Sequence, residues 1–226
     1  MILIYSVILI TKVYHFADNF GKKIKEMKKL NNKLAIVTGG NSGIGYATAK
    51  ELIAEGAKVI ITGRRKEAIE KAAAELGAIS FVADQGKLED IENFRTHVEK
   101  EFGKIDILFI NAGITGSLGP IEHMSAENFD NVMGINFRGA YFTLSKFIPL
   151  LNDGASVVFL SSNVATTSKP NSSIYQASKA ALNSIAKTAA AELAPRKIRV
   201  NLVSPGLTKT EIMTKAGLDE KTLEGL

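Results

Sequence analysis

Residues 34–45 read Leu-Ala-Ile-Val-Thr-Gly-Gly-Asn-Ser-Gly-Ile-Gly, and this stretch decides the fold class. An apolar run at Leu34–Val37 leads directly into a glycine-rich turn, and a helical pattern follows at about residues 44–56. Glycine permits tight turns and lets the backbone approach a bound group closely. A helix N-terminus offers free N–H groups and a positive dipole end to an anion such as a pyrophosphate. The stretch therefore predicts a first strand, a phosphate-binding loop and a helix.

The glycine spacing in this loop is Gly-x-x-x-Gly-x-Gly, from Gly39 to Gly45. It differs from the Gly-x-Gly-x-x-Gly of the usual dinucleotide fingerprint, and it lacks the Gly-Lys-Ser/Thr of a P-loop. A glycine-rich turn without a ligand is the alternative, but the position between the first strand and a helix favours phosphate binding. The predicted phosphate loop consists of Thr38, Gly39, Asn41, Ser42, Gly43, Ile44 and Gly45.

Short apolar runs and longer helical patterns alternate along the rest of the chain. The predicted strands are 34–37, 58–61, 78–82, 105–110, 156–160 and 199–203. The predicted helices are 44–56, 66–76, 88–102, 126–151 and 173–194. Strands that are apolar throughout and are each followed by a helix indicate a parallel sheet covered on both faces. With right-handed crossovers, the sequence predicts a doubly wound, Rossmann-like α/β fold with six strands.

Composition excludes several classes of protein. The chain has 226 residues, 46% of them apolar and 23% charged, and no cysteine, so disulfide scaffolds and Cys-ligated zinc are excluded. The three histidines are far apart, and we expect no metal site. The net charge of +5 equals the excess of seven lysines over two acidic residues within residues 1–33, so the rest is neutral. We therefore expect no nucleic-acid partner. The absence of cysteine fits a reducing compartment, and we expect a cytoplasmic location.

The N-terminal segment has two interpretations. Met1–Ile10 is apolar but too short to span a bilayer, and it lacks the features of a signal peptide. It is either a weak membrane-surface anchor, or part of a mis-called extension at residues 1–26 with Met27 as the true start. We favour the second interpretation, and we therefore expect no membrane association and a single domain at residues 27–226.

The end of the second strand bears on the choice of dinucleotide. An acidic residue there would bind the free ribose 2′-hydroxyl of NAD. The sequence instead reads Ile61-Thr62-Gly63-Arg64-Arg65, with no acid. A guanidinium pairs well with a 2′-phosphate. Arg64 thus favours NADP(H), with NAD(H) still possible. The alternative is a pair of solvated arginines at a helix start.

Tyr175 and Lys179 lie one helical turn apart and suggest acid–base chemistry. A cation about 4 Å from the phenol, at an effective dielectric near 20, is worth about 4 kcal/mol. That would lower the pKa of Tyr175 toward neutrality, where a phenol can act as general acid or base. The same spacing occurs at Tyr46 and Lys50, directly after the phosphate loop, and we interpret that pair as structural. Ser162 ends the fifth strand and could donate a hydrogen bond to a substrate carbonyl, or it could cap a helix or turn.

Taken together, these motifs resemble the short-chain dehydrogenase/reductase family over about residues 28–215. The resemblance is closest to acyl-carrier-protein ketoreductases and to sugar or alcohol dehydrogenases. The motifs occur in the family's order and spacing at Thr38–Gly45, Asn111-Ala112-Gly113, Asn136, Ser162, Tyr175, Lys179 and Pro205-Gly206.

The resemblance implies a set of catalytic roles. Tyr175 would protonate a carbonyl oxygen or deprotonate an alcohol. Lys179 would lower the pKa of Tyr175 and bind the nicotinamide ribose, Ser162 would orient the carbonyl, and Asn136 would hold a water in a proton relay. These roles imply an NADP(H)-dependent oxidoreductase that acts on a small carbonyl or alcohol.

The resemblance also implies cofactor contacts after the third, fourth and sixth strands. They are Asp84, Gln85, Asn111, Ala112, Gly113, Pro205, Gly206, Thr208 and Thr210. Asp84 and Gln85 would lie at the adenine, and Asn111 would stabilise the central sheet. Thr208 and Thr210 would contact the nicotinamide carboxamide.

Two departures from the family pattern affect these expectations. Ile110 stands where many members have an asparagine, which is a tolerated variant. The sequence ends at Leu226, before the family's last helix and seventh strand, so we expect a truncated chain whose sixth strand exposes an unpaired edge. The alternative function is therefore an inactive remnant that at most binds a dinucleotide. The homo-oligomer expected for the family is in doubt for the same reason.

Overall fold

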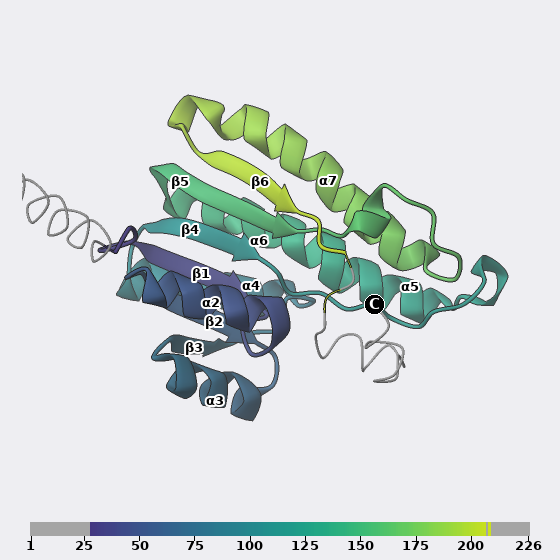
Figure 1. The fold of residues 1–226 in the computed structure, drawn as a ribbon, viewed down its shortest axis with the longest axis horizontal. Coiled ribbons are helices and arrows are strands. Elements are labelled where there is room, and N and C mark those ends of the chain that lie inside the picture. The colour runs from purple at the N-terminus through teal and green to yellow at the C-terminus, as the bar shows by residue number, and fades with distance from the viewer. Residues whose placement is uncertain (1–27, 207, 209–226) are drawn as a thin grey trace, which may run out of the picture.

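The predicted α/β architecture is confirmed by a computed structural model that describes residues 28–206 and 208. The described part contains one six-stranded parallel sheet in the order β3-β2-β1-β4-β5-β6 (Figure 1). Its strands are β1 (Leu34–Thr38), β2 (Lys58–Gly63), β3 (Ile79–Val82), β4 (Ile105–Ile110), β5 (Leu151–Leu160) and β6 (Arg199–Val203). The N-terminal extension, residues 1–26, lies outside the described residues.

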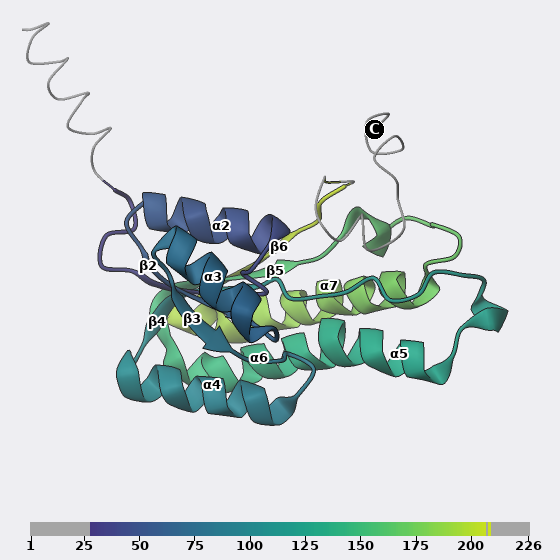
Figure 2. The same ribbon diagram turned by 90° about the horizontal axis from the view of Figure 1, so that it is seen from below.

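Helices cover both faces of this sheet. The α-helices are α2 (Gly43–Ala54), α3 (Lys66–Leu76), α4 (Leu88–Glu101), α5 (Ala126–Met133), α6 (Ala140–Phe147) and α7 (Ser173–Leu193). A π-helical turn, η2 (Gly134–Gly139), joins α5 to α6. Short 3-10 turns occur at η1 (Ile121–His123), η3 (Ile148–Leu150), η4 (Asn163–Ala165) and η5 (Ala194–Arg196). Figure 2 shows α2 and α3 on one side of the sheet and α4, α6 and α7 on the other.

The central strand, β1, is buried on both faces, as its uninterrupted apolar run predicts. Ile36 belongs to the core that includes Phe147 and Leu182 from the helices of one side. Ala35 and Val37, which point the opposite way, belong to the core that includes Ala49 and Ile69 from α2 and α3.

The strand order reverses at β1 and fixes where a ligand can bind. The chain first moves outward from β1 to β2 and β3, and then returns to place β4 on the other side of β1. Ligands of open α/β sheets bind outside the carboxyl ends of the strands at such a reversal. The residues that follow β1 and β4 are therefore expected to border a binding site.

Asp106 connects three segments near the opposite, amino-terminal ends of the strands. It accepts hydrogen bonds from the backbone N–H of Leu34 (3.0 Å), from Lys33 Nζ (3.0 Å) and from Asn152 Nδ2 (3.1 Å). Burial alone would raise the pKa of Asp106, but these bonds and the charge of Lys33 outweigh it, so the pKa is lowered.

Most predicted element boundaries differ from the structure by at most two residues, but the prediction for the region between β4 and β5 is wrong. The single helix expected over 126–151 consists of α5, η2, α6 and η3, and β5 begins at Leu151 instead of Ser156. Leu151 pairs with Ile105, whereas Ser156 pairs with Ile107, so β5 carries extra residues between the two pairs. These include Gly154, whose φ of +81° suits glycine in an irregular strand.

Candidate active site

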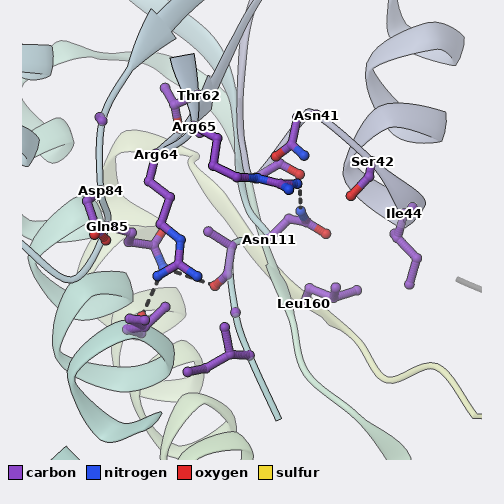
Figure 3. A pocket seen from close by; sticks show the side chains of 18 of the residues that line it. Asn41, Ser42, Ile44, Thr62, Arg64, Arg65, Asp84, Gln85, Asn111 and Leu160 are labelled. Atoms are coloured by element: carbon purple, nitrogen blue, oxygen red, sulfur yellow. Dashed lines mark hydrogen bonds between the residues drawn. The ribbon is translucent and has the colours of Figure 1, made fainter. Parts of the chain in front are cut away.

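A cavity of about 340 Å³ opens where the strand order reverses. Residues that follow β1, β2, β3 and β4 line it, together with the start of α2 (Figure 3). Its lining includes many of the predicted cofactor residues: Gly39, Asn41, Ser42, Gly43, Ile44, Arg64, Asp84, Gln85, Asn111, Ala112 and Gly113. The structure thus brings predicted cofactor residues from four segments of the chain into one pocket.

The glycines of the phosphate loop are required by close backbone approach. Gly39 has a φ of +66°, and a Cβ there would lie 2.9 Å from the Cα of Ala112. A Cβ on Gly45 would overlap the carbonyl oxygen of Gly39. Ser42 precedes α2 in an extended conformation and makes no side-chain capping bond. The first turn of α2 therefore presents backbone N–H groups to the pocket, an arrangement suited to a phosphate group.

Thr38 and Asn111 hold the floor of the pocket together. Thr38 Oγ1 accepts hydrogen bonds from the backbone N–H groups of Asn111 and Ala112, both at 3.0 Å. Asn111 Nδ2 donates to the carbonyl oxygens of Thr38 (2.8 Å) and Gly39 (3.0 Å). Thr38 is buried beneath the loop, so its side chain fixes the pocket's geometry rather than lining the pocket.

Positive charge gathers at the β2 end of the pocket. Arg64 and Arg65 are exposed and line the pocket, and Figure 3 shows both side chains extending across it from the strand end. Asp84 is the one acidic residue among the described residues that line the cavity. Its Oδ1 accepts a hydrogen bond from the backbone N–H of Gly86 at 2.9 Å. The β2 end of the pocket, where Arg64 and Arg65 lie, therefore suits an anionic group.

Ser162, Tyr175 and Lys179 meet beside the pocket, although they do not line it. Lys179 Nζ lies 5.7 Å from the centre of the Tyr175 ring, and Ser162 is close enough to Tyr175 to lower the pKa of its phenol through hydrogen bonding. Lys179 Nζ donates to the carbonyl oxygen of Leu160 at 2.7 Å, and Leu160 lines the cavity. A Cβ on Gly113 would lie 3.5 Å from the same ammonium. The three side chains therefore adjoin the β4 and β5 side of the pocket.

Asn136 lies on the π-helical turn η2 and is fully committed to protein contacts. Its Oδ1 accepts from the backbone N–H of Ile114 at 2.8 Å. Its Nδ2 donates to the carbonyl oxygen of Ile114 at 2.8 Å and to Ser178 Oγ at 3.1 Å. The side chain thus fixes the segment after β4 relative to α7. The water-holding role of Asn136 stays a prediction.

The sequence model of the short chain dehydrogenase family matches residues 33–221. The chain belongs to the short-chain dehydrogenase/reductase family. The predicted resemblance is therefore confirmed, and the chain joins a family of oxidoreductases.

Individual members of the family agree with this assignment. The oxidoreductase asL5 of Sarocladium schorii is 40% identical over 195 residues, which are 84% of this chain and 78% of that protein. A short-chain dehydrogenase from Burkholderia cenocepacia, solved with NADP, superposes with a TM-score of 0.78 at 35% identity, covering 81% of this chain and 78% of that one. A 3-ketoacyl-(acyl-carrier-protein) reductase from Brucella melitensis, complexed with NADH, gives 0.80 at 34% identity, covering 87% and 83%. These neighbours support a nicotinamide dinucleotide cofactor for this chain.

The predicted lowering of the Tyr175 pKa is wrong for this structure. Burial raises the pKa of Tyr175, and the hydrogen bond with Ser162 opposes that rise only in part. Lys179 does not produce the expected shift, because its ammonium is directed at the carbonyl oxygen of Leu160. Burial also lowers the pKa of Lys179 from 10.5 to about 8. Lys179, rather than Tyr175, is the group whose pKa is moved toward neutral pH.

Two further interpretations can be compared with the structure. Tyr46 donates a hydrogen bond to Glu75 Oε2 at 3.2 Å, which joins α2 to α3 and supports a structural role. Ser162 also accepts a 3.4 Å hydrogen bond from the backbone N–H of Val164 and caps η4. The two interpretations of Ser162, as a cap and as a site residue, are therefore compatible.

The segment after β6 approaches the site from another direction. The carbonyl oxygen of Pro205 accepts a hydrogen bond from the backbone N–H of Asn163 at 3.0 Å, beside Ser162. Gly206 follows, and Thr208 is exposed, with its Oγ1 bonded to the carbonyl oxygen of Gly206 at 3.2 Å. Thr210 lies outside the described residues, so its predicted role stays a prediction.

Sequence reasoning missed part of the pocket lining. The unassigned residues are Thr62, Gly63, Arg65, Ala83, Ile114, Thr115, Ile135 and Leu160. Most directly adjoin an assigned residue in the chain, and that adjacency was the available signal. Ile135 likewise directly precedes Asn136, but the π-helical turn that presents its side chain to the pocket is not evident in the sequence. None of the helices within residues 28–206 combines the length and apolar character needed to cross a membrane.

Proposed function

We propose that this chain transfers a hydride between NADP(H) and a small carbonyl or alcohol substrate, with Tyr175 as general acid or base. The observation that carries the proposal is the meeting of Ser162, Tyr175 and Lys179 beside a glycine-lined pocket. These side chains are connected to the pocket directly, because Lys179 is hydrogen-bonded to the carbonyl oxygen of Leu160, a residue that lines the pocket. Family membership supports the same reaction class.

The pocket fits a dinucleotide in shape and charge. The loop from Gly39 to Gly45 leaves no room for a Cβ at either end and opens onto the first turn of α2, which suits a pyrophosphate. Arg64 would pair with a ribose 2′-phosphate, and Asp84 would lie at the adenosine end. When bound, the nicotinamide ring supplies or accepts the hydride.

The protein's own contribution is proton transfer and orientation. In reduction, the hydroxyl of Tyr175 gives its proton to the carbonyl oxygen, while Ser162 donates a hydrogen bond to that oxygen. In oxidation, Tyr175 takes the proton from the alcohol. Lys179, whose ammonium is hydrogen-bonded to the carbonyl oxygen of the pocket-lining Leu160, would bind the nicotinamide ribose.

Turnover with a panel of small ketones and NADPH tests the reaction. We expect Tyr175→Phe to lower kcat by about 100-fold or more and to change the Kd for NADPH by no more than about threefold, because the hydroxyl acts in the transition state. Tyr46→Phe removes the same hydroxyl from a structural pair and should leave kcat unchanged. NADPH binding without any turnover would contradict the proposal and favour a remnant that only binds dinucleotide.

Cofactor choice is tested separately at the end of β2. We expect NADPH to bind at least about tenfold tighter than NADH, which is about 1.4 kcal/mol. Arg64→Asp should erase or reverse this preference. Lys71→Asp makes the same charge change at an exposed position outside the pocket and should preserve it. Equal affinities of the unmodified chain for both cofactors would refute the role of Arg64.

A further inference from the structure

Gln85 does not present its side chain to a ligand in the way that the sequence suggests. The residue is 93% buried, at 7% exposure. Its Nε2 donates to the carbonyl oxygens of Ala112 and Ile135, both at 3.0 Å, so both amide hydrogens are used (Figure 3). Its Oε1 is buried and has no hydrogen-bond partner among the described residues. The amide therefore connects two backbone segments and leaves no accessible group for an adenine ring.

The turn that carries Gln85 is pressed tightly against the π-helical turn η2. A Cβ on Gly139 would overlap the carbonyl oxygen of Gln85. A Cβ on Gly86 would lie 3.1 Å from Cγ1 of Ile135. Only glycine at both positions allows this approach without a shift of the neighbours. The hydrogen bond from Gln85 to Ile135 thus lies at the centre of a close contact between the turn after β3 and η2.

From η2 a continuous set of hydrogen bonds reaches the catalytic helix. Asn136, next to Ile135, donates to Ser178 Oγ at 3.1 Å. Ser178 is fully buried on α7, and its hydroxyl donates to the carbonyl oxygen of Tyr175 at 2.7 Å. Movement of η2 would therefore be transmitted to the backbone of the proposed general acid.

We propose that Gln85 is a positioning residue that holds η2 against the turn after β3. It thereby sets the positions of Asn136 on η2 and of Tyr175 on α7. The inference rests on the proposed function insofar as Tyr175 is taken as the acid or base. It assigns Gln85 to the geometry of the catalytic helix rather than to recognition of adenine. Its effect belongs to kcat, not to affinity for the adenosine half of the cofactor.

The first experiment separates these two roles with Gln85→Met, which is similar in length and has no hydrogen-bond donor. We expect kcat to fall at least tenfold, while the Kd for 2′,5′-ADP, which lacks the nicotinamide, changes less than threefold. Lys87→Met places the same side chain at an exposed position in the same turn and should change neither quantity. A tenfold loss of 2′,5′-ADP affinity at unchanged kcat would show that Gln85 contacts adenine. No change in either would show that its bonds are dispensable. Both results overturn the proposal.

A second measurement needs no turnover. The ring resonances of Tyr175 in a chain with isotope-labelled tyrosine, assigned through Tyr175→Phe, should shift in Gln85→Met and stay in place in Lys87→Met. Ser178→Ala breaks the same set of bonds at its far end and should reproduce the shift, the loss of kcat and the intact 2′,5′-ADP affinity. An unchanged Tyr175 resonance in both variants overturns the inference. Absence of turnover in the unmodified chain, with the shift present, counts against the proposed function alone.

Discussion

Replacing Lys179 by methionine should stabilise this chain at neutral pH while it abolishes activity. The side chain is 3% exposed, and burial lowers its pKa from 10.5 to about 8. That difference corresponds to about 3 kcal/mol by which the folded state disfavours the protonated side chain at pH 7. Methionine removes this penalty but leaves the carbonyl of Leu160 without its donor, at a cost of about 1–2 kcal/mol. We expect a net gain of about 1–2 kcal/mol in the free energy of unfolding.

The pH dependence of that gain is the sharper test. Below pH 8 the lysine is protonated in both states and the penalty is complete. Between about pH 8 and 10.5 only the unfolded state holds the proton, so the unmodified chain gains stability with rising pH. Urea unfolding of both proteins should show the advantage of Lys179→Met shrinking by about 2–3 kcal/mol from pH 7 to pH 10. Lys187→Met, at an exposed position of the same helix, should show no such trend. A pH-independent difference for Lys179→Met would refute the reasoning.

Two further predictions concern the pocket and the sheet. Gly45→Ala forces a Cβ onto the carbonyl oxygen of Gly39. The Kd for NADPH, measured by fluorescence titration, should therefore rise at least about tenfold. An unchanged Kd would mean that the loop relaxes without loss of phosphate binding. Asp106→Asn weakens three hydrogen bonds and should cost about 1–2 kcal/mol of unfolding free energy at pH 7. Because the pKa of Asp106 is lowered, its contribution is present above the unfolded pKa and is lost as pH falls through the folded one. The difference should therefore shrink below about pH 4, and a constant difference down to pH 2 in urea unfolding would contradict this account.

Much of the fold could be predicted because apolar runs favour buried strands and glycines favour tight turns, and both effects are local in the sequence. The run at Leu34–Val37 and the loop after it defined β1, the turn and α2 correctly. The start of β5 could not be found this way, since Asn152-Asp153-Gly154 has the composition of a turn and forms an irregular strand only because Leu151 pairs with Ile105.

For the candidate site, the sequence predicted which residues lie close together but not their electrostatics. Spacing alone placed Tyr175 and Lys179 on one face of a helix, and the structure does bring them beside Ser162. The direction of each pKa shift depended on burial and on the carbonyl of Leu160, which no spacing in the sequence encodes. The hydrogen bonds of the Gln85 side chain could not be predicted either, because both acceptors are backbone carbonyl oxygens of residues distant in the chain.

The central position of β1 has a consequence for how the chain acquires its structure. Residues 34–82 contain β1, β2 and β3, which are neighbours in both sequence and sheet, and they can pair through short crossovers. The other edge of β1 pairs with β4, at Ile36 and Leu108, so it stays unpaired until residues 105–110 emerge during synthesis. Such non-local parallel pairing is slow, since loop closure precedes any stabilising contact. The edge of β1 that later joins β4, through the contacts between Thr38 and Asn111, is thus open to mispairing in the nascent chain.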